Sequence, residues 1–398
     1  MKILLLTSNY PADDIPKDVT PVVHYFAKEW THMGHEVLVI HNQTVFPRLI
    51  YPLLRLFKKV LMNVAGFNFV SSSIPEKKYE LDGVKVCRLC IKKRYPNAPF
   101  SKKSYLSQEK KIKEILQKEQ FVPELIIGHW LTPQLRLVCD IRKEFVAKTA
   151  IIIHEYPEIL NRDYGKKSEE YLKEIDVYGF RAVKLREMFK APYPSLMEKP
   201  YFICHSGVPE KYLETGFHVV KSPLKKFTFV GSLVKRKYPE CLMEALKGYH
   251  DDFVINYIGS GPMESNLRDL INKYDLTSRV KMFGRIPRDK VNEVMNETDC
   301  FIMISKDETF GLVYLEAMAH GCITIGAEKE GIDGVIVNGE NGFLCEAGNA
   351  DALRDLINRI NHCDADSIAE VSRKARLTAM AYTNYNVAKK YLENVNDK

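Results

Sequence analysis

The stretch from residue 305 to 321, SKDETFGLVYLEAMAHG, constrains the fold of this chain more than any other. It follows an apolar run, residues 300–304 (CFIMI), whose length and composition predict a central strand of a parallel sheet. Polar residues then break the run, helix-favouring residues fill 312–319, and Gly321 is placed to end that helix. A buried strand, a short loop and a helix in this order predict an α/β fold with a parallel sheet.

The loop between the predicted strand and helix has the properties of an anion site. The free backbone N–H groups of Phe310, Gly311 and Leu312 would point at a phosphate, and the helix dipole would favour its negative charge. Two carboxylates flank the loop. Glu308 would lie near the distal end of a bound diphosphate, and Glu316 could accept hydrogen bonds from a ribose diol. The alternative is that both are ordinary exposed acids.

This stretch also carries a family resemblance. The residues from Glu308 to Leu312 (ETFGL) and from Glu316 to Gly321 (EAMAHG) resemble the Glu-x7-Glu motif of retaining glycosyltransferases of family 4, which are group 1 enzymes with the GT-B fold. The resemblance covers nearly the whole chain and is strongest over 226–356. It implies two Rossmann-like, doubly wound α/β domains that face each other across a cleft. Residues 1–205 would bind the acceptor and 206–375 the nucleotide-sugar, and 376–398 would form a helix that crosses back to the first domain.

Other donor-site candidates lie in the second half of the chain. Three basic residues, 235–237, follow a predicted strand and Gly231, and such cations bind phosphate well unless they form only a solvated loop. The resemblance implies that Arg236 and Lys237 bind the donor diphosphate. It further implies that the turn at Gly259 borders the nucleotide and that the base lies near Arg285 and Ile286.

Two histidines follow predicted strands in the first half. His129 follows the strand 124–128, and His154 follows the strand 149–153. Ligands of open α/β sheets bind beyond the carboxyl ends of strands, although each histidine could instead be structural. The resemblance implies that His154 faces the donor sugar, and we place it ahead of His129. The first loop has Thr20-Pro21 where the family usually has a Gly-Gly pair.

The order of the remaining elements fits the same fold. Residues 2–7, 21–32 and 36–40 predict a strand, a helix and a second strand, which make a β-α-β unit. We also expect helices over 110–118 and 178–189. A dehydrogenase is disfavoured because no Gly-x-Gly-x-x-Gly follows the first strand.

Composition limits the partners. The net charge of +7 suits anionic ligands, and residues 45–70 contain four basic residues and no acid. From residue 53 the apolar and basic positions separate on a helical projection, which predicts a helix that lies on an anionic membrane or packs on the sheet. A second basic cluster comprises Lys92, Lys93, Arg94, Lys102 and Lys103. No nucleic-acid partner is expected, because nothing resembles a nucleic-acid module.

Cysteine usage and hydropathy point to the cytoplasm. The nine cysteines show no disulfide pattern, the lone Cys87-x-x-Cys90 has no second pair for zinc, and no stretch is apolar enough to span a membrane. The N-terminal run is too short for a signal segment and suits a first strand. We therefore expect a cytoplasmic protein, either free or peripheral on the inner membrane face.

The expected function is retaining, metal-independent transfer of a sugar from a nucleotide donor, with UDP-sugars ahead of GDP-sugars. We expect no cofactor and no metal, since the one Asp-x-Asp, at 364–366, lies far downstream in a helical tail. The acceptor would be a saccharide or a polyprenyl-linked saccharide in surface polysaccharide or glycolipid synthesis. One alternative is a GT-B nucleotide-sugar epimerase that uses His129, His154 and Glu155 as bases. The other is a catalytically degenerate partner subunit.

Overall fold

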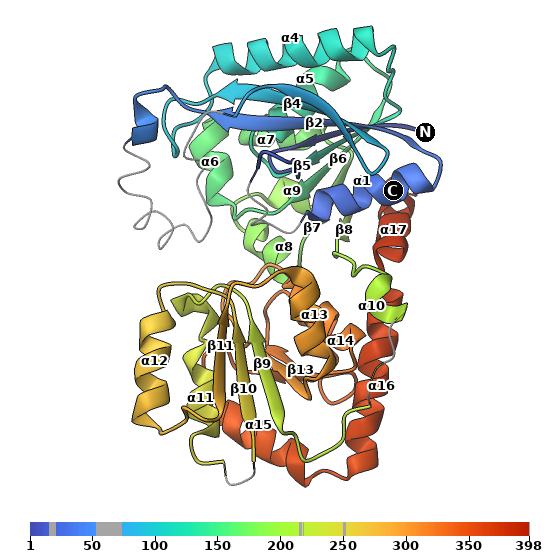
Figure 1. Cartoon of the computed structure of the whole chain (residues 1–398). Coiled ribbons are helices and arrows are strands. Elements are labelled where there is room, and N and C mark those ends of the chain that lie inside the picture. Colours follow the sequence, from blue (N-terminus) through green and yellow to red (C-terminus); the bar gives the residue numbers. More distant parts are fainter. Residues whose placement is uncertain (16–20, 53–73, 215–216, 218, 250–251, 398) are drawn as a thin grey trace. The chain divides into compact units, whose positions relative to one another are not determined.

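The computed structural model describes residues 1–397 except 16–20, 53–73, 215–216, 218 and 250–251, and these residues form two compact units (Figure 1). Among the described residues, unit 1 runs from Met1 to His205 and resumes at Asn384, and unit 2 runs from Ser206 to Thr383. The basic segment from residue 53 onward, for which we expect an amphipathic helix, lies outside the described residues. Among the residues that the structure describes, no helix combines the length and apolar character that a membrane span requires.

Unit 1 is built on an eight-stranded sheet in the described residues, with the order β3-β4-β2-β1-β5-β6-β7-β8. All neighbouring strands are parallel except β3, which pairs antiparallel with β4. The strands are β1 (Lys2–Thr7), β2 (Glu36–Val45), β3 (Lys77–Leu81), β4 (Val84–Lys92), β5 (Leu125–His129), β6 (Lys148–Ile153), β7 (Val177–Phe180) and β8 (Tyr201–Ile203). The central strands β1, β5 and β6 are short apolar runs buried on both faces, as a helix-covered parallel sheet requires.

Helices cover the sheet of unit 1. They are α1 (Val22–His32), α4 (Lys102–Lys118), α5 (Gln134–Arg142), α6 (Glu158–Tyr164), α7 (Ser168–Glu174), α8 (Val183–Lys190), α9 (Pro194–Met197) and α17 (Asn384–Asn396). The last of these belongs to unit 1 through its packing on α1. The buried Trp30 indole donates a hydrogen bond to Ala388 O at 2.9 Å, and its ring meets that of Tyr391 edge to face.

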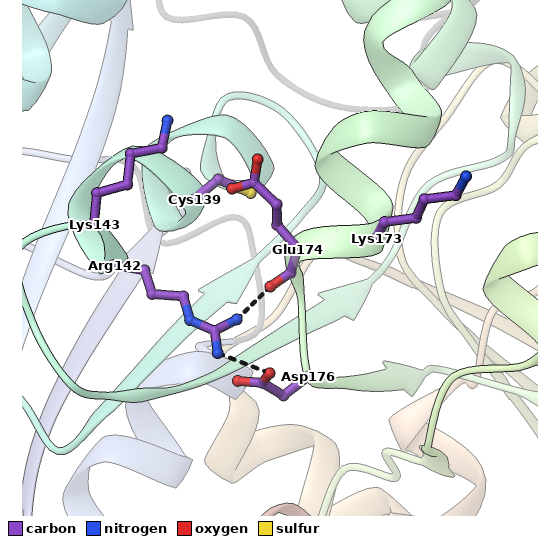
Figure 2. Close-up of a pocket in the computed structure, with 6 residues that line it drawn as sticks. All are labelled: Cys139, Arg142, Lys143, Lys173, Glu174 and Asp176. Atoms are coloured by element: carbon purple, nitrogen blue, oxygen red, sulfur yellow. Dashed lines mark hydrogen bonds and ion pairs between the residues drawn. The ribbon is translucent and has the colours of Figure 1, made fainter.

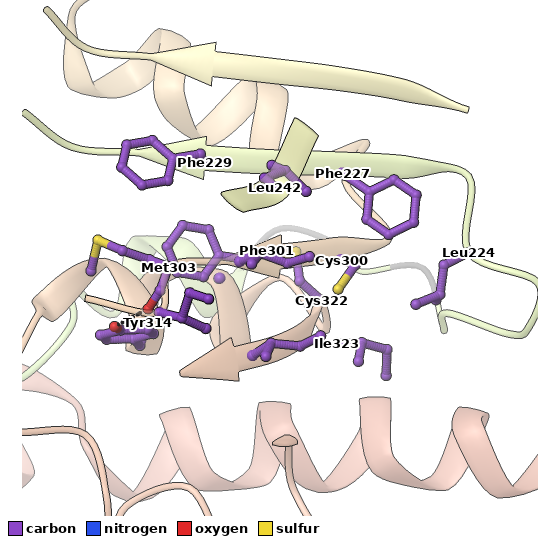
Figure 3. Packing of buried hydrophobic residues seen from close by; sticks show 14 of the residues in the cluster. Leu224, Phe227, Phe229, Leu242, Cys300, Phe301, Met303, Tyr314, Cys322 and Ile323 are labelled. Atoms are coloured by element: carbon purple, nitrogen blue, oxygen red, sulfur yellow. Dashed lines mark hydrogen bonds between the residues drawn. The ribbon is translucent and has the colours of Figure 1, made fainter. Parts of the chain in front are cut away.

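Unit 2 contains a six-stranded parallel sheet in the described residues, with the order β11-β10-β9-β12-β13-β14. The strands are β9 (Lys226–Val230), β10 (Val254–Ile258), β11 (Val280–Gly284), β12 (Cys300–Ile302), β13 (Ile323–Ala327) and β14 (Phe343–Cys345). The helices are α10 (Lys211–Glu214), α11 (Glu240–Leu246), α12 (Glu264–Lys273), α13 (Arg288–Asn296), α14 (Leu312–Ala319), α15 (Ala350–His362) and α16 (Ala365–Ala381). Figure 3 shows the core of this unit, where Phe227, Phe229 and Phe301 pack in one cluster with Tyr314 of α14.

Three segments differ from the sequence-based expectations. The predicted helix over 178–189 is wrong in its first half, because β7 occupies Val177–Phe180 as a fully buried strand between β6 and β8 and only α8 is helical. The helix expected at 110–118 begins earlier, where the Ser101 hydroxyl accepts the Ser104 N–H and caps α4. Residue 376 lies within α16, and the return to unit 1 comes at Asn384.

Candidate active site

The carboxyl ends of β9, β10 and β12 bring three loops of unit 2 together. The backbones of the loops after β9 and β10 approach so closely that only glycine fits at position 259. A Cβ there would lie 1.8 Å from Gly231 O. Gly259 also adopts φ +139°, a conformation that other residues rarely adopt. Leu233 N donates to Ser260 O at 3.0 Å and joins the first loop to the second. Gly231 and Gly259 therefore allow the close backbone contact between these two loops.

The loop after β12 leads into α14 through a residue that must be glycine. Gly311 adopts φ 74° and ψ 74°, and a Cβ there would lie 2.5 Å from the Tyr314 ring. Helix α14 has no side-chain N-cap, so no side chain caps the N–H groups of its first turn. Phe310, Gly311 and Leu312, from which we expect an anion site, form this helix start. Phe310 is buried, and Gly311 and Leu312 are half-buried.

The basic loop expected to bind the diphosphate lies against the loop after β12. Lys306 N donates to Arg236 O at 2.8 Å, and the Arg236 guanidinium donates to Asp307 O at 3.2 Å. These bonds hold the 3-10 turn Lys235–Lys237 next to the start of α14. The structure thus brings the basic loop and the helix start into one place.

Glu308 is the centre of this cluster. Its carboxylate lies 3.1 Å from the Lys237 ammonium and 3.5 Å from the Arg236 guanidinium. The side chains of Glu308 and Lys237 are each 13% exposed, whereas Arg236 is 47% exposed. Two cations at a helix N-terminus suit a diphosphate, and Glu308 compensates part of their charge before a diphosphate binds.

The alternative prediction, that Glu316 is an ordinary exposed acid, is wrong. The side chain is buried. Its carboxylate is buried on α14 and forms an ion pair with Arg288, the first residue of α13. Sequence analysis did not single out Arg288, because nothing local indicates which of several basic residues faces a buried acid. The pair places a carboxylate of fixed orientation one helical turn from the start of α14.

A third carboxylate of the site escaped the sequence analysis. Glu330, on the loop after β13, is buried, and its Oε2 accepts the Glu308 N–H at 3.2 Å. Gly331 N donates in return to Glu308 O at 2.9 Å, and a Cβ on Gly331 would meet the Thr309 backbone at 2.4 Å. The Glu330 loop therefore sets the position of the Glu308 backbone.

The two residues expected near the base lie beyond the edge strand β11. Arg285 is exposed, and Ile286 is half-buried against the core of unit 2. Phe283 in the same edge strand is also exposed. The side chains of Phe283 and Arg285 at this edge are therefore accessible to solvent.

In unit 1, the histidines expected at the strand ends lie against each other. The His129 Nδ1 and His154 Nε2 atoms are 3.1 Å apart, and the Tyr391 hydroxyl lies 3.3 Å from His129 Nε2. The Trp130 ring stacks on His154 at a centroid distance of 4.2 Å. Burial holds the pKa of His129 and of His154 well below the usual value, so both rings are neutral at pH 7.

Glu155 ties the loop after β5 to the loop after β6. Both carboxylate oxygens accept the Leu131 N–H at 3.0 Å, and Oε2 also accepts the His154 N–H at 3.3 Å. Burial raises the pKa of Glu155 to about 7. A carboxylate engaged with the backbone in this way positions Trp130 and His154, and this role differs from that of the free base an epimerase would need.

A pocket of about 390 Å³ lies at the opposite, amino-terminal edge of the unit 1 sheet (Figure 2). Its lining residues include Cys139, Arg142 and Asp176. The Arg142 guanidinium points into the space between Glu174 O and the Asp176 carboxylate and bonds to both. Because parallel sheets bind ligands at their carboxyl ends and this arginine is already paired, we do not assign the pocket to the active site.

Metal ligands are not gathered anywhere in the described ranges. No group of three or more His, Cys, Asp or Glu residues there has an arrangement that could hold a metal ion. The Cys90 thiol donates to Ile74 O, and Cys87 is buried on β4. In the downstream Asp-x-Asp, Asp364 caps α16 by accepting the Ser367 N–H.

Comparison with known proteins gives three informative matches. An uncharacterized glycosyltransferase of Methanocaldococcus jannaschii is 24% identical over 66% of this chain and 73% of its own length. The amylovoran biosynthesis glycosyltransferase of Erwinia amylovora is 28% identical, but the match spans only 47% of this chain and 48% of that protein. The Anabaena HepE protein in complex with UDP and glucose is similar over the full length of both chains, with a TM-score of 0.66 and 16% identity.

The part of the chain that matches a protein-family model lies in unit 2. Residues 216–378, which include Arg236, Lys237, Glu308 and Glu316, match the model of the family described as glycosyl transferases group 1. The two parallel sheets and the solved structures that resemble them establish the two-domain fold. The chain therefore has the GT-B fold, and its residues 216–378 are similar to the group 1 glycosyl transferases.

Proposed function

We propose that this protein transfers a sugar from a nucleotide-diphosphate sugar, preferably a UDP-sugar, to a saccharide or lipid-linked saccharide, with retention of anomeric configuration. The observation that carries the proposal is the meeting of Lys237, Arg236 and Glu308 at the uncapped start of α14. The UDP complex of the similar Anabaena protein supports the choice of donor.

The chemistry requires stabilisation of a leaving diphosphate. As the anomeric bond breaks, negative charge grows on the diphosphate and positive charge grows on the sugar. Lys237, Arg236 and the N–H groups of residues 310–312 would stabilise the leaving group, and preorganised donors of this kind make the largest contribution to such steps. Two cations and a helix end can do this without a metal ion. Glu308 would then contact the donor sugar, and Glu316 the ribose.

We assign the acceptor to unit 1. His154 and Trp130 lie at the carboxyl ends of β6 and β5, where α/β sheets bind ligands. A neutral His154, which we expect to face the donor sugar, can accept a hydrogen bond from a sugar hydroxyl or donate one to it without attracting the donor's phosphates. The matches to polysaccharide-biosynthesis enzymes support a product of that class.

A peripheral membrane position is part of the proposal. The sequence 45–70 combines apolar residues with Arg55, Lys58 and Lys59, and the exposed side chains of Lys92, Arg94 and Tyr95 lie at or just after the end of β4. Co-sedimentation with anionic vesicles should fall when Arg55, Lys58 and Lys59 are replaced by Glu. Unchanged co-sedimentation would exclude this segment as a membrane contact.

The test of the donor assignment is calorimetric titration of the purified chain with UDP, GDP, ADP and CMP in the presence of EDTA. We expect one nucleoside diphosphate, UDP, to bind without metal. Failure of all four to bind would favour the catalytically degenerate partner subunit. A positive result would be followed by NMR of the product with matching acceptors, where an inverted anomeric signal would contradict retention.

The epimerase alternative has less support from the site. It needs a free base near the sugar, whereas the Glu155 carboxylate is engaged by the Leu131 and His154 N–H groups. Incubation with UDP-N-acetylglucosamine in the absence of acceptor tests it directly, because an epimerase would exchange a proton at the inverted carbon with deuterated solvent.

A further inference from the structure

Unit 1 buries a lysine to which no carboxylate of the described residues is bonded. Lys93 directly follows β4 and is only 8% exposed, and its ammonium lies 4.7 Å from the centroid of the Phe100 ring. Within the described ranges, neither a hydrogen bond nor an ion pair involves this ammonium. A buried charge of this kind is costly, and burial accordingly lowers the pKa of Lys93. Structural packing alone would favour an uncharged side chain at this position.

The carboxylate that raises the pKa of Lys93 is already neutralised by another residue. Asp163 at the end of α6 is fully buried, and its two oxygens accept bonds from the Nε and Nη2 groups of Arg162 at 2.8 and 2.9 Å. Asp163 and Arg162 both influence the pKa of Lys93, in opposite directions. The three residues together therefore carry one net positive charge.

Two hydroxyl groups beside these charges have unused hydrogen-bonding capacity. The Tyr105 Oη and Thr132 Oγ1 atoms are buried, and each lies near the Tyr164 hydroxyl without forming a hydrogen bond of good geometry among the described residues. Tyr105 packs edge to face on Phe100 at a centroid distance of 5.8 Å. The neighbouring Tyr164 hydroxyl donates instead to Leu131 O at 2.8 Å. Buried polar groups without partners are uncommon and call for an explanation such as a ligand.

The position of these residues in the fold indicates what kind of ligand can reach them. Lys93 follows the carboxyl end of β4, Thr132 follows that of β5, and α6 follows β6. The residues therefore gather at the same edge of the sheet as His154, where unit 1 would receive its acceptor. We call Lys93, Tyr105, Thr132, Arg162 and Asp163 the Lys93 cluster.

We propose that the Lys93 cluster binds an anionic group of the acceptor, a phosphate or a carboxylate, so that the substrate accepting the sugar is itself negatively charged. The ammonium would supply the charge, and the Tyr105 and Thr132 hydroxyls would donate hydrogen bonds to the anionic oxygens. The identification of the anion as part of the sugar acceptor depends on the glycosyltransferase function proposed above. The binding of an anion by the Lys93 cluster does not depend on it.

The test is a titration of the full chain with inorganic phosphate and with a sugar 1-phosphate, followed by NMR or calorimetry. Saturating UDP, or a Lys237→Met background, keeps phosphate out of the diphosphate site of unit 2. Lys93→Met should weaken binding about tenfold or more, which is the usual effect of losing a charged hydrogen bond. Lys92→Met is the matched control, because Lys92 is the exposed neighbour at the end of the same strand. Equal affinity in all three proteins, or an equal loss in both variants, would overturn the proposal.

Thermal unfolding separates ligand binding from a structural role. Without added phosphate, Lys93→Met should unfold at the same or a higher temperature than the parent, because the variant no longer buries an unpaired charge. The stabilisation that phosphate gives the parent should be absent. A lower unfolding temperature in Lys93→Met would indicate a structural lysine and count against the proposal. Tyr105→Phe, which removes only the hydroxyl, should also weaken phosphate binding several-fold, and unchanged binding there would exclude Tyr105.

Two further arms identify the source of the anion and separate this inference from the proposed function. The phosphate group can be presented on a small molecule, as a soluble sugar phosphate, or on a lipid, as polyprenyl phosphate in phosphatidylcholine vesicles. Vesicles without polyprenyl phosphate are the control. If the parent binds one of these two ligands more tightly and Lys93→Met shows no such preference, that ligand is the source of the anion. UDP binding should be the same in the parent and in Lys93→Met. Phosphate binding without UDP binding would overturn only the donor assignment, and UDP binding without phosphate binding would overturn only this inference.

Discussion

The Lys237 ammonium and the Glu308 carboxylate lie 3.1 Å apart, and Lys237 shares that carboxylate with Arg236. The phosphate-binding lysine of the proposed donor site is largely buried, and a buried charge is costly unless it is paired. Glu308 compensates the charge of Lys237, and diphosphate oxygens would compete with it for the same ammonium. Binding of the diphosphate would then leave Glu308 free to face the sugar.

Lys237→Met should weaken UDP binding more than Arg236→Met, because Lys237 is largely buried and Arg236 is half exposed. Loss of a charged hydrogen bond of about 1.5–3 kcal/mol corresponds to roughly a tenfold to hundredfold weaker affinity. Lys235→Met, at an exposed residue of the same turn, is the control and should bind as the parent does. Calorimetry with UDP measures all three. Full affinity in Lys237→Met would remove that residue from the donor site.

Glu308→Gln should lower turnover roughly 100-fold while UDP affinity stays the same or increases. Turnover falls because the carboxylate no longer faces the developing positive charge of the sugar, and affinity holds because the competitor for Lys237 is gone. Turnover and UDP affinity are measured separately on the same preparations. Glu328→Gln, which changes an exposed acid on the β13 loop, is the control for charge. A variant with normal turnover would show that Glu308 has only the pairing role.

Glu316→Gln should weaken binding of UDP more than binding of 2′,3′-dideoxy-UDP. The reason is that the proposed partners of this carboxylate are the ribose hydroxyls, which the dideoxy nucleotide lacks. Arg288→Met tests the alternative, in which Glu316 exists only to pair with Arg288. If both variants unfold at lower temperature but discriminate between the two nucleotides as the parent does, Glu316 is structural.

Gly259→Ala should destabilise unit 2 and abolish UDP binding, because the new Cβ would lie 1.8 Å from Gly231 O and the backbone has φ +139°. Neither loop can move away without breaking the bond from Gly231 N to Ile258 O. Gly248→Ala is the matched substitution, since a Cβ there meets nothing within 4 Å. Thermal unfolding should therefore show a clear drop for the first variant and none for the second.

Glu155→Gln should change how stability depends on pH. The pKa of Glu155 is raised from 4.5 to about 7, so the folded chain retains a proton that the unfolded chain releases between these values. The contribution of Glu155 to stability is therefore present below pH 4.5 and is lost as pH rises to about 7.

Relative to the parent, Glu155→Gln should accordingly gain stability as pH rises from 4.5 to 7 and level off above that range. The comparison with the parent is essential. Burial lowers the pKa of His129 and His154, and these histidines have the opposite effect on stability in the same acidic range in both proteins. Denaturant unfolding at several pH values measures the difference, and a constant difference would mean that Glu155 titrates normally.

Local pattern was sufficient for most of the fold. Short apolar runs bounded by polar loops predicted β1, β5 and β6 within a residue or two of their ends, because a buried parallel strand needs such a run. The same reasoning failed at 178–189, where a buried strand and a helix lie only two residues apart and periodicity cannot separate them.

The sequence by itself indicated a basic loop and a helix start that each follow a strand of a parallel sheet, and its family resemblance implied that Arg236, Lys237 and Glu308 meet at one site. Only the tertiary structure decided which charges are paired and which are buried. Arg288 reaches Glu316, Glu330 bonds to the Glu308 backbone, and Lys93 lies beside a neutralised Asp163. These contacts join residues on different elements, and burial sets their energies. Neither the contacts nor the burial is a property of a local stretch of sequence.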